Sequence, residues 1–405
     1  MNIFREIPPT AGIPLEAGDF LSLLPVVKYK GSLEDDFKNY LSAPYAQVTY
    51  SGTAAFYIIL ESLKKLSSKK TVIIPSFICP LIPLAIKRAG LNVLVCDINK
   101  DNFDFDRAQL EKLCSKNNDL LAIIATHLAG IPVDLDFIRG MAKKEKIFVI
   151  EDCAQAQGAI YKDKKVGTIG DLSFFSLCRG KGLTIYEGGV ITGKTEYAKI
   201  INQNIKDIEK GNFSSETLKI IELFGYWIFY RPLLFWLVFK APQVFWELQG
   251  NLEKASIEYF TIDFPLHKVS SFRKKIGHFS FSRLDKEIDG QRKKAVYYIE
   301  ALKDTAGIKI IRESREAQAN YPFLTLIFDD PAKRNKAFKL FRNSGLGISR
   351  IYLSAITDYE YLKSITGDQE APNARYLAER HITLSTSTFL KNSELDYIAK
   401  RIKEL

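Results

Sequence analysis

Several features that mark specialised classes of protein are missing from this chain. Its five cysteines are odd in number and include no CxxC pair, which argues against a disulfide framework and against a zinc site. The N-terminus has no basic region followed by an apolar core, so no signal peptide is predicted. We therefore expect a reducing, cytoplasmic compartment and no bound metal.

Clustered charge is missing as well. The formal net charge is +10 and the pI about 9.1, a balance that favours anionic partners such as phosphorylated metabolites or an acidic membrane surface. The charge is spread along the chain, however, and no basic block is interleaved with aromatic residues. Nucleic-acid binding is therefore not expected.

Patterning between residues 50 and 195 indicates an α/β fold. Short apolar runs alternate there with amphipathic stretches, which is typical of a mostly parallel sheet flanked by helices. The expected strands are Val72–Ile74, Val93–Val95, Leu120–Ala125, Ile147–Ile150, Leu172–Ser176 and Gly189–Thr192. The expected helices are Ala54–Leu66, Pro80–Ala89, Phe105–Cys114 and Leu135–Lys144. Such sheets bind ligands at the carboxyl ends of their strands, so chemistry is expected in the residues that follow them.

The last third of the sequence predicts a smaller α+β domain. At 405 residues the chain exceeds the size at which a single core keeps growing, so two domains are expected. We predict a large domain over residues 1–282, and a linking helix with a small domain over residues 283–405. The elements expected in this second part are a long charged helix at Arg283–Lys303, a strand at Tyr321–Phe328, and helices at Pro331–Asn343 and Ser393–Glu404.

An aromatic stretch from 218 to 248 forms an insertion in the large domain, over about residues 218–250. It contains all three tryptophans of the chain. A spanning helix needs about 20 consecutive apolar residues, and Arg231-Pro232 and Lys240 interrupt this stretch. Two interpretations stay open: a hydrophobic hairpin lying in a membrane interface, or burial in a core or a subunit contact.

A turn of small residues opens one of the expected helices. Ser51-Gly52-Thr53-Ala54-Ala55 directly precedes a helical pattern. Backbone N–H groups at the start of a helix have no partner within it, which suits a phosphate. An ordinary N-cap by Ser51 or Thr53 explains the same residues.

Polar residues also follow two of the apolar strands. Ile150 leads into Glu151 and Asp152, and an acid at a strand end is a natural partner for the cationic ring nitrogen of a cofactor. The alternative is an acid that caps the next turn. His127 follows another strand, where it either lines a substrate pocket or has a structural role.

A lysine in a glycine-flanked loop completes the set. Lys181 lies between Gly180 and Gly182, shortly after the apolar strand that ends at Ser176. An amine in such a loop forms a Schiff base with a cofactor aldehyde if its pKa is lowered, and a neighbouring cation such as Arg179 does that. A lone lysine is usually a solvated surface group, but Lys181 occurs in the same chain as the Ser51–Ala55 turn and the acids after Ile150, which favours a cofactor site.

With these segments in this order, the chain resembles the DegT-type sugar aminotransferases, from the Ser51-Gly52-Thr53 turn to the region of Leu384. The resemblance implies a fold-type-I, pyridoxal 5'-phosphate (PLP)-dependent transferase in which Lys181 is the catalytic residue and cofactor anchor. It also implies that Asp152 pairs with the pyridine nitrogen and that Gln155 contacts the ring. The phosphate contacts that it implies are Ser176, Thr53 and Ala54.

The chain also departs from the family pattern. A cysteine, Cys79, stands near the place of the aromatic residue that stacks on the cofactor ring. The asparagine that the family supplies from a partner subunit is missing from Phe264–Val269, where His267 or Lys268 can replace its phosphate contact. The aromatic stretch is not typical either. These departures fit a divergent branch that serves cell-surface polysaccharide or glycolipid synthesis.

The resemblance predicts an enzyme that transfers an amino group from an amino acid, glutamate above all, to a nucleotide- or lipid-linked keto-sugar. His127, Arg179 and Glu187 are the predicted substrate contacts. A homodimer is expected, with a peripheral contact to the inner face of the membrane through 218–248. The alternatives are a PLP-dependent sugar dehydratase or isomerase, although relatives that dehydrate carry a histidine at the place of Lys181, and an inactive membrane-associated scaffold of the same fold.

Overall fold

A computed structural model describes residues 4–21, 30–250 and 259–405. Its centre is a seven-stranded sheet in the order β1-β9-β8-β5-β4-β2-β3. The strands are β1 (Tyr45–Thr49), β2 (Thr71–Pro75), β3 (Asn92–Cys96), β4 (Leu120–Thr126), β5 (Phe148–Asp152), β8 (Leu172–Ser176) and β9 (Gly189–Gly193). Only β9 runs antiparallel to its neighbours, so the predicted mostly parallel sheet is confirmed.

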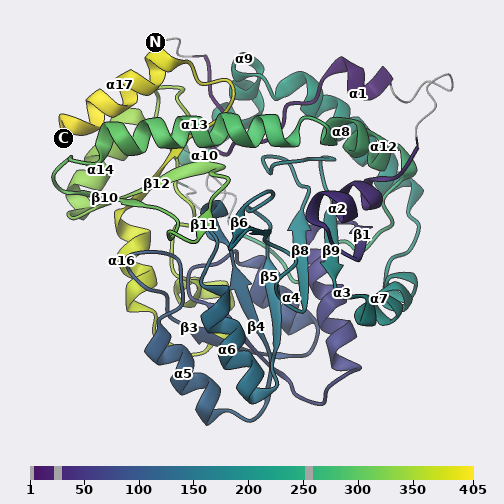
Figure 1. Cartoon of the computed structure of the whole chain (residues 1–405). Coiled ribbons are helices and arrows are strands. Elements are labelled where there is room, and N and C mark those ends of the chain that lie inside the picture. The colour runs from purple at the N-terminus through teal and green to yellow at the C-terminus, as the bar shows by residue number, and fades with distance from the viewer. Residues whose placement is uncertain (1–3, 22–29, 251–258) are drawn as a thin grey trace.

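Helices cover both faces of this sheet. The helices of the large part are α1 (Ala17–Leu21), α2 (Leu33–Leu41), α3 (Gly52–Lys64), α4 (Leu81–Arg88), α5 (Arg107–Lys116), α6 (Leu135–Glu145) and α7 (Thr195–Ile208). Apolar side chains of α2, α5 and α6 share one buried cluster with the sheet, and those of α3, α4 and α7 share another. In Figure 1, α5 and α6 lie in front of the sheet and α3 and α4 behind it. Because both faces are covered, all seven residues of β4 are buried.

The C-terminal part of the chain contains a second sheet, which is antiparallel and has three strands in the order β10-β12-β13. Its elements are β10 (Ile308–Ile311), β12 (Phe323–Phe328), β13 (His381–Ser385), α13 (Leu284–Leu302), α14 (Pro331–Phe341), α15 (Lys363–Thr366), α16 (Pro372–Arg380) and α17 (Asn392–Lys403). The long helix α13 crosses the top of the molecule in Figure 1 and reaches this sheet. The elements predicted after residue 282 are therefore present, while the domain boundary itself stays a prediction.

Two smaller features join the parts of the chain. The short strands β6 (Ile160–Tyr161), β7 (Lys164–Lys165) and β11 (Ala317–Gln318) pair into a separate small sheet. The N-terminal segment lies against the C-terminal part, where the Ile7 amide donates to the Gly345 carbonyl and the Ala11 amide to that of Pro322. Sequence patterning predicted neither of these two hydrogen bonds, because each joins residues more than 150 positions apart in the chain.

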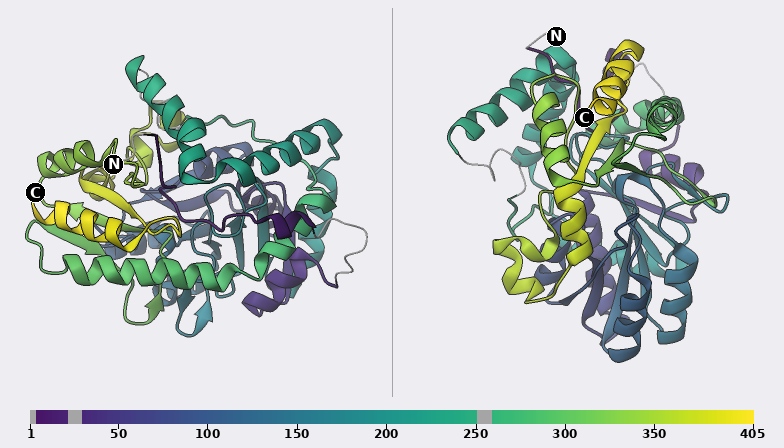
Figure 2. Two further views of the ribbon diagram at one scale, coloured as in Figure 1. Left: turned by 90° about the horizontal axis from the view of Figure 1, so that it is seen from above. Right: turned by 90° about the vertical axis from the view of Figure 1, so that its left-hand side faces the viewer.

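The aromatic stretch folds into a bent helical arm, here defined as residues 213–248. It consists of α8 (Phe213–Phe229), α9 (Pro232–Phe235), a π-helical turn (Trp236–Lys240) and α10 (Ala241–Leu248). Asn212 caps α8, whose Ser215 amide donates to the Asn212 side chain, and Pro232 starts α9 at a position where no N–H is needed. In Figure 2, α10 projects from the body of the molecule.

The arm alone approaches the length and composition of a membrane segment. No single described helix is long and apolar enough to cross a bilayer. Phe213–Phe229 and Pro232–Trp246 reach the required length and composition only as a pair, with a bend of 118° between them. One buried ion pair anchors the arm, because the guanidinium of Arg273 on α12 (Ser271–Phe281) donates to both carboxylate oxygens of Glu216.

Candidate active site

Asp152 ends β5 as a buried carboxylate. It is 6% exposed, and one of its oxygens accepts a hydrogen bond of 3.0 Å from the Ala154 amide. Burial raises its pKa, while that amide and the charge of Lys181 lower it. No cationic side chain of the described residues forms an ion pair with this carboxylate. A cationic ring nitrogen would supply the missing partner.

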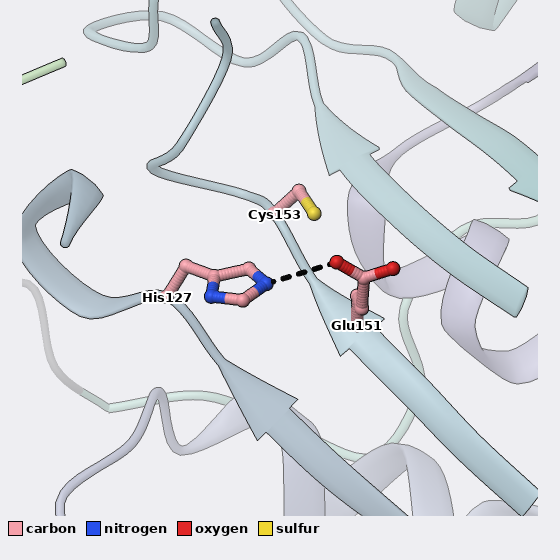
Figure 3. A group of neighbouring side chains, drawn as sticks. All are labelled: His127, Glu151 and Cys153. Atoms are coloured by element: carbon pink, nitrogen blue, oxygen red, sulfur yellow. Dashed lines mark hydrogen bonds and ion pairs between the residues drawn. The ribbon is translucent and has the colours of Figure 1, made fainter. Parts of the chain in front are cut away.

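The neighbouring Glu151 has a different task. Its carboxylate accepts hydrogen bonds from the amides of Gly167, Ile169 and Gly170 at 2.7, 2.7 and 2.6 Å. It also lies 3.2 Å from the Nε2 atom of His127, as Figure 3 shows. Although burial raises the pKa of Glu151, these hydrogen bonds and the histidine hold it below its usual range. Glu151 thus fixes the turn that precedes β8.

His127 is fully enclosed. Its side chain has no exposed surface, and its Nδ1 atom accepts a hydrogen bond of 3.2 Å from the Val133 amide. With Glu151 on the other ring nitrogen, both nitrogens have partners. Cys153 lies close to this pair, but the lone pairs of Glu151 are already used by hydrogen bonds (Figure 3). The placement favours the structural role of His127 over the predicted substrate contact.

The start of α3 lies against the end of β8. A Cβ atom placed on Gly52 would stand 3.1 Å from the Ser176 Cβ atom, a tight contact that any larger residue could relieve only by moving one of the two segments. Strand pairing produces the closeness, because Gly189 of β9 is opposite both Thr49 and Ser176. The serine hydroxyl and the open end of a 13-residue helix therefore share one place.

The open amides of this helix start are those of Gly52 and Thr53. The Ala54 amide donates a hydrogen bond of 3.0 Å to the Ser51 hydroxyl, which acts as the N-cap. Both explanations given for the Ser51–Ala55 turn hold together: Ser51 caps the helix, and two further N–H groups face outward from the helix start. The Ala54 amide is occupied by this cap in the present conformation, and the predicted phosphate contacts of Thr53 and Ala54 stay predictions.

Gln157 braces the loop that carries Lys181, a role that the sequence did not suggest. Its side-chain oxygen accepts a hydrogen bond of 2.6 Å from the Leu183 amide, and its nitrogen donates to the Ser176 carbonyl at 3.3 Å. The Ile13 amide donates to the Gly182 carbonyl at 2.8 Å from the other side. Gly182 and Leu183, which directly follow Lys181, are thereby held by Ile13 and Gln157.

Gln155 also lies at this end of the sheet. Its side-chain oxygen accepts a hydrogen bond of 2.9 Å from the Ala129 amide. That bond joins the segment after β5 to the turn after β4, and it leaves the amide nitrogen of Gln155 as a donor for a ligand. The predicted contact with the cofactor ring remains compatible with this placement.

The two other predicted substrate contacts lie on the far side of the lysine loop. Arg179 is exposed, with its guanidinium carbon 5.6 Å from the centre of the Tyr186 ring. Glu187 forms an ion pair of 2.8 Å with Lys219 of α8. Glu187 thus ties the lysine loop to the aromatic arm, whereas Arg179 presents its charge to solvent.

The segment in which the family asparagine is missing lies close to the helix start. The rings of His267 and Tyr50 meet edge to face, with 5.3 Å between their centres, and Tyr50 directly precedes Ser51. His267 therefore lies near the Gly52 and Thr53 amides of its own chain. Cys79 packs among partly buried residues beside the cluster that contains α3 and α4.

A pocket of about 650 Å³ opens beside the lysine. Lys181, Arg179 and Gly180 form one wall. The opposite wall comes from the arm, with Tyr226, Tyr230, Phe235, Val238 and Phe239. Tyr226 and Tyr230 stack with their ring centres 4.4 Å apart, and their spacing of four residues on one helix was the only sequence signal for this wall.

The residues at this end of the sheet fit PLP. A buried acid without a cationic partner suits the ring nitrogen, and a helix start with Ser176 suits the phosphate. The lysine lies on the loop between them, close enough for its charge to act on Asp152. The ring nitrogen, the phosphate and the aldehyde of the cofactor therefore each have a chemically matched group at this end of the sheet.

Comparison with solved structures shows the same fold. The aminotransferase PseC of Helicobacter pylori, involved in pseudoaminic acid biosynthesis, superposes with a TM-score of 0.75 over 99% of both chains at 16% identity. The PLP form of a sugar aminotransferase from Streptococcus pneumoniae, Spr1654, gives 0.73 over 98% of both at 19% identity. GDP-4-keto-6-deoxy-D-mannose-3-dehydratase of E. coli also gives 0.73, over 98% of this chain and 99% of its own, at 18% identity.

Curated relatives match between about half and nine tenths of the chain. GDP-perosamine synthase of Escherichia coli O157:H7 is 34% identical over 176 residues, which are 43% of this chain and 48% of the relative. The chain thus spans about half the length of the first relatives that it matches. dTDP-4-amino-4,6-dideoxy-D-glucose transaminase of Shigella dysenteriae is 23% identical over 92% of this chain and 89% of its own. The model of the DegT/DnrJ/EryC1/StrS aminotransferase family matches residues 24–212 and 267–403, which is most of the chain. The chain therefore belongs to the DegT/DnrJ/EryC1/StrS aminotransferase family.

Proposed function

We propose that this protein is a PLP-dependent aminotransferase that transfers an amino group from an amino acid, glutamate first among them, to a keto-sugar. The observation that carries the proposal is the convergence of a buried acid, a lysine loop and an open helix start at one end of the sheet. The family membership and the PLP and PMP forms of a relative of the same fold support it.

In this proposal Lys181 acts twice. Its Nζ atom anchors the cofactor, and once displaced by the amino donor it accepts the proton from the donor's α-carbon. The same nitrogen then returns a proton to a neighbouring carbon. Gln157 restricts these movements, because it fixes the Leu183 amide next to the loop.

Asp152 and the helix start do not move protons. The Asp152 carboxylate holds a proton on the ring nitrogen, and bound PLP then supplies an electron sink for the carbanion formed at the substrate. The amides of Gly52 and Thr53, together with the Ser176 hydroxyl, hold the phosphate and so fix the position of the ring. Arg179, exposed at the pocket wall, is the proposed contact for an anionic part of the sugar substrate.

An absorption spectrum of the purified protein tests the proposal. A visible band of lysine-bound cofactor that disappears on addition of glutamate is the expected result. Labelled amino donor added with candidate keto-sugars should then yield a labelled amino-sugar. A band that every amino donor leaves unchanged would favour the dehydratase or isomerase alternative, which shares this fold with a solved relative. Absence of a band with added PLP would favour the inactive scaffold.

The setting of the reaction is part of the proposal. We place the enzyme in cell-surface polysaccharide or glycolipid synthesis, as a homodimer at the cytoplasmic side of the membrane. The perosamine and aminosugar enzymes among its relatives support the sugar class of the acceptor. Size-exclusion chromatography with light scattering measures the oligomeric state directly.

A further inference from the structure

The aromatic arm lies outside the part of the chain that matches the family model. The family match stops at residue 212 and resumes at residue 267, so the whole arm lies outside it. Yet the arm is attached to the active-site end of the protein: Lys219 pairs with Glu187 of the lysine loop, and Arg273 pairs with Glu216. Arg273 also donates to the carbonyl oxygens of Ile185 and Glu187. An element outside the family match that is fixed to the lysine loop has the position to change the substrate.

The outer surface of the arm is unusually apolar. Of the 17 large hydrophobic side chains that are exposed among the described residues, ten belong to the arm. Leu233, Leu237 and Val238 are 59%, 53% and 50% exposed on its second half. A monomeric protein in water rarely keeps so many such side chains together on one element.

The cations within the second half of the arm face inward. Arg231 donates hydrogen bonds to the carbonyl oxygens of Tyr230 and Leu15, both at 2.9 Å. Lys240 is 8% exposed and lies close to Glu6, where burial raises the pKa of that carboxyl to about 7 and the charge of Lys240 opposes the rise. Because the side chains of Arg231 and Lys240 point inward, the outer surface between Pro232 and Phe245 stays apolar.

The pocket connects this surface with Lys181. Phe229 and Val238, which are 37% and 50% exposed, line the pocket together with Lys181 and Arg179. The pocket thus joins apolar side chains of the arm to the polar residues of the lysine loop.

We infer that the arm lies in the hydrocarbon of a membrane leaflet, and that its pocket takes the hydrocarbon chain of a lipid-linked keto-sugar whose sugar reaches Lys181. The inference rests on the proposed function and names the class of its acceptor. In such an amphiphile the long chain would contact the apolar side chains of the arm, the phosphate would contact Arg179, and the sugar would reach Lys181.

Net charge and the bent pair of apolar helices favour a lipid surface as the occupant. The chain carries a net charge of +10, and the inner leaflet of membranes is anionic. All three tryptophans lie on the arm and are partly buried, and the rings of Trp227 and Trp236 pack against Phe20 and Phe4. The 118° bend allows two short apolar helices to lie within one leaflet without spanning it. A second copy of the chain is the competing occupant.

The tryptophans also supply the test, because fluorescence of the whole protein reports on the arm alone. We would titrate the full-length protein with vesicles of phosphatidylglycerol and phosphatidylcholine brominated in the middle of its acyl chains. Quenching is expected, and Leu237→Glu should raise the lipid concentration for half-maximal quenching about tenfold. The matched control is Leu66→Glu, since Leu66 is 49% exposed but lies outside the arm; it should leave the titration unchanged.

A second pair of variants tests the pocket. A Cβ atom on Gly225, which lines the pocket, meets nothing within 4 Å, so Gly225→Phe adds a side chain at the pocket, and Gly140→Phe makes the same change on the exposed surface of α6, where a Cβ atom also meets nothing. The probe is geranylgeranyl monophosphate, followed by calorimetry. Its binding should weaken about tenfold in the Gly225 variant and stay unchanged in the Gly140 variant.

Three results would overturn the inference: no quenching of the unmodified protein, equal titrations for Leu237→Glu and Leu66→Glu, or equal probe binding by both glycine variants. A shift of Leu237→Glu from dimer to monomer without an effect on vesicles would assign the surface to a second copy. None of these measurements needs the reaction with glutamate. A protein that binds vesicles but whose cofactor band ignores amino donors would instead contradict the proposed function.

Discussion

The strand ends around Lys181 and the aromatic arm beside them are built in opposite ways. At the strand ends, buried polar groups have many hydrogen bonds, as at Glu151, and the segments belong to the part of the chain that matches the family. The arm lies outside that match, exposes apolar side chains and is held by a few ion pairs. The comparison suggests that the chemistry resides in the part that matches the family model and the choice of substrate in the arm.

Lys181→Ala should have the largest effect of any single change. Removing the amine removes both the cofactor anchor and the proposed proton carrier, so we expect no visible cofactor band and no measurable transamination. Absorption spectroscopy and an assay with labelled glutamate measure the two losses. Turnover retained by this variant would break the assignment of the chemistry to the strand ends.

Asp152→Asn should come next, with a fall in kcat of about 100-fold or more, since a neutral amide no longer favours the protonated ring nitrogen. The matched variant is Glu151→Gln, which weakens the anchor of residues 167–170 and His127. It should lower Tm without a comparable direct effect on kcat per folded molecule. If Glu151→Gln instead lowered kcat and Asp152→Asn lowered only Tm, Glu151 would be the partner of the ring nitrogen and Asp152 the structural acid.

Arg273→Met tests how the arm is attached. Arg273 has no exposed surface, and removing one partner of a buried ion pair leaves the other charge uncompensated, at a cost of about 3–5 kcal/mol. Urea denaturation should show this loss in the free energy of unfolding. Adding Glu216→Gln to the variant should restore part of it, because the unpaired carboxylate is then absent. No recovery in the double variant would mean that the bonds of Arg273 to the lysine loop dominate.

Glu209→Gln should have the smallest effect, and one that depends on pH. Glu209 follows α7 and accepts a hydrogen bond of 3.0 Å from the Tyr50 amide, and burial raises its pKa to about 7. An acid whose folded-state pKa exceeds the usual 4.5 makes the folded state less stable as pH rises from 4.5 to 7. Glutamine keeps the acceptor oxygen without the charge. The variant should be more stable than the native protein at pH 8, by at most about 3 kcal/mol, and the gain should vanish near pH 4.

Denaturant midpoints at pH 4 and pH 8 measure this difference. A gain of equal size at both pH values would show that ionisation of Glu209 does not cause it. Because Glu209 holds the residue before the Ser51 turn and precedes the arm, the variant also shows whether the two regions share stability.

Local sequence patterns were enough to predict six of the seven strands of the large sheet. The apolar runs at β2, β3, β4, β5, β8 and β9 were predicted within a few residues, because a sheet covered on both faces needs buried side chains at nearly every position. Neither β1 nor the small sheet of β6, β7 and β11 was predicted. Each depends on pairing with a strand more than 100 residues away, with the exception of the β6–β7 turn.

For the site, the sequence determined which groups are available: an acid at a strand end, a lysine between glycines and a helix start with small residues. Only the tertiary structure decided how they are used. His127 became a structural partner of Glu151, Gln157 became the brace of the lysine loop, and the tyrosines of α8 became a pocket wall. The reason is physical: the partners of a buried polar group, and the surface that an apolar helix covers, are set by segments distant in sequence that folding brings within hydrogen-bond or van der Waals distance.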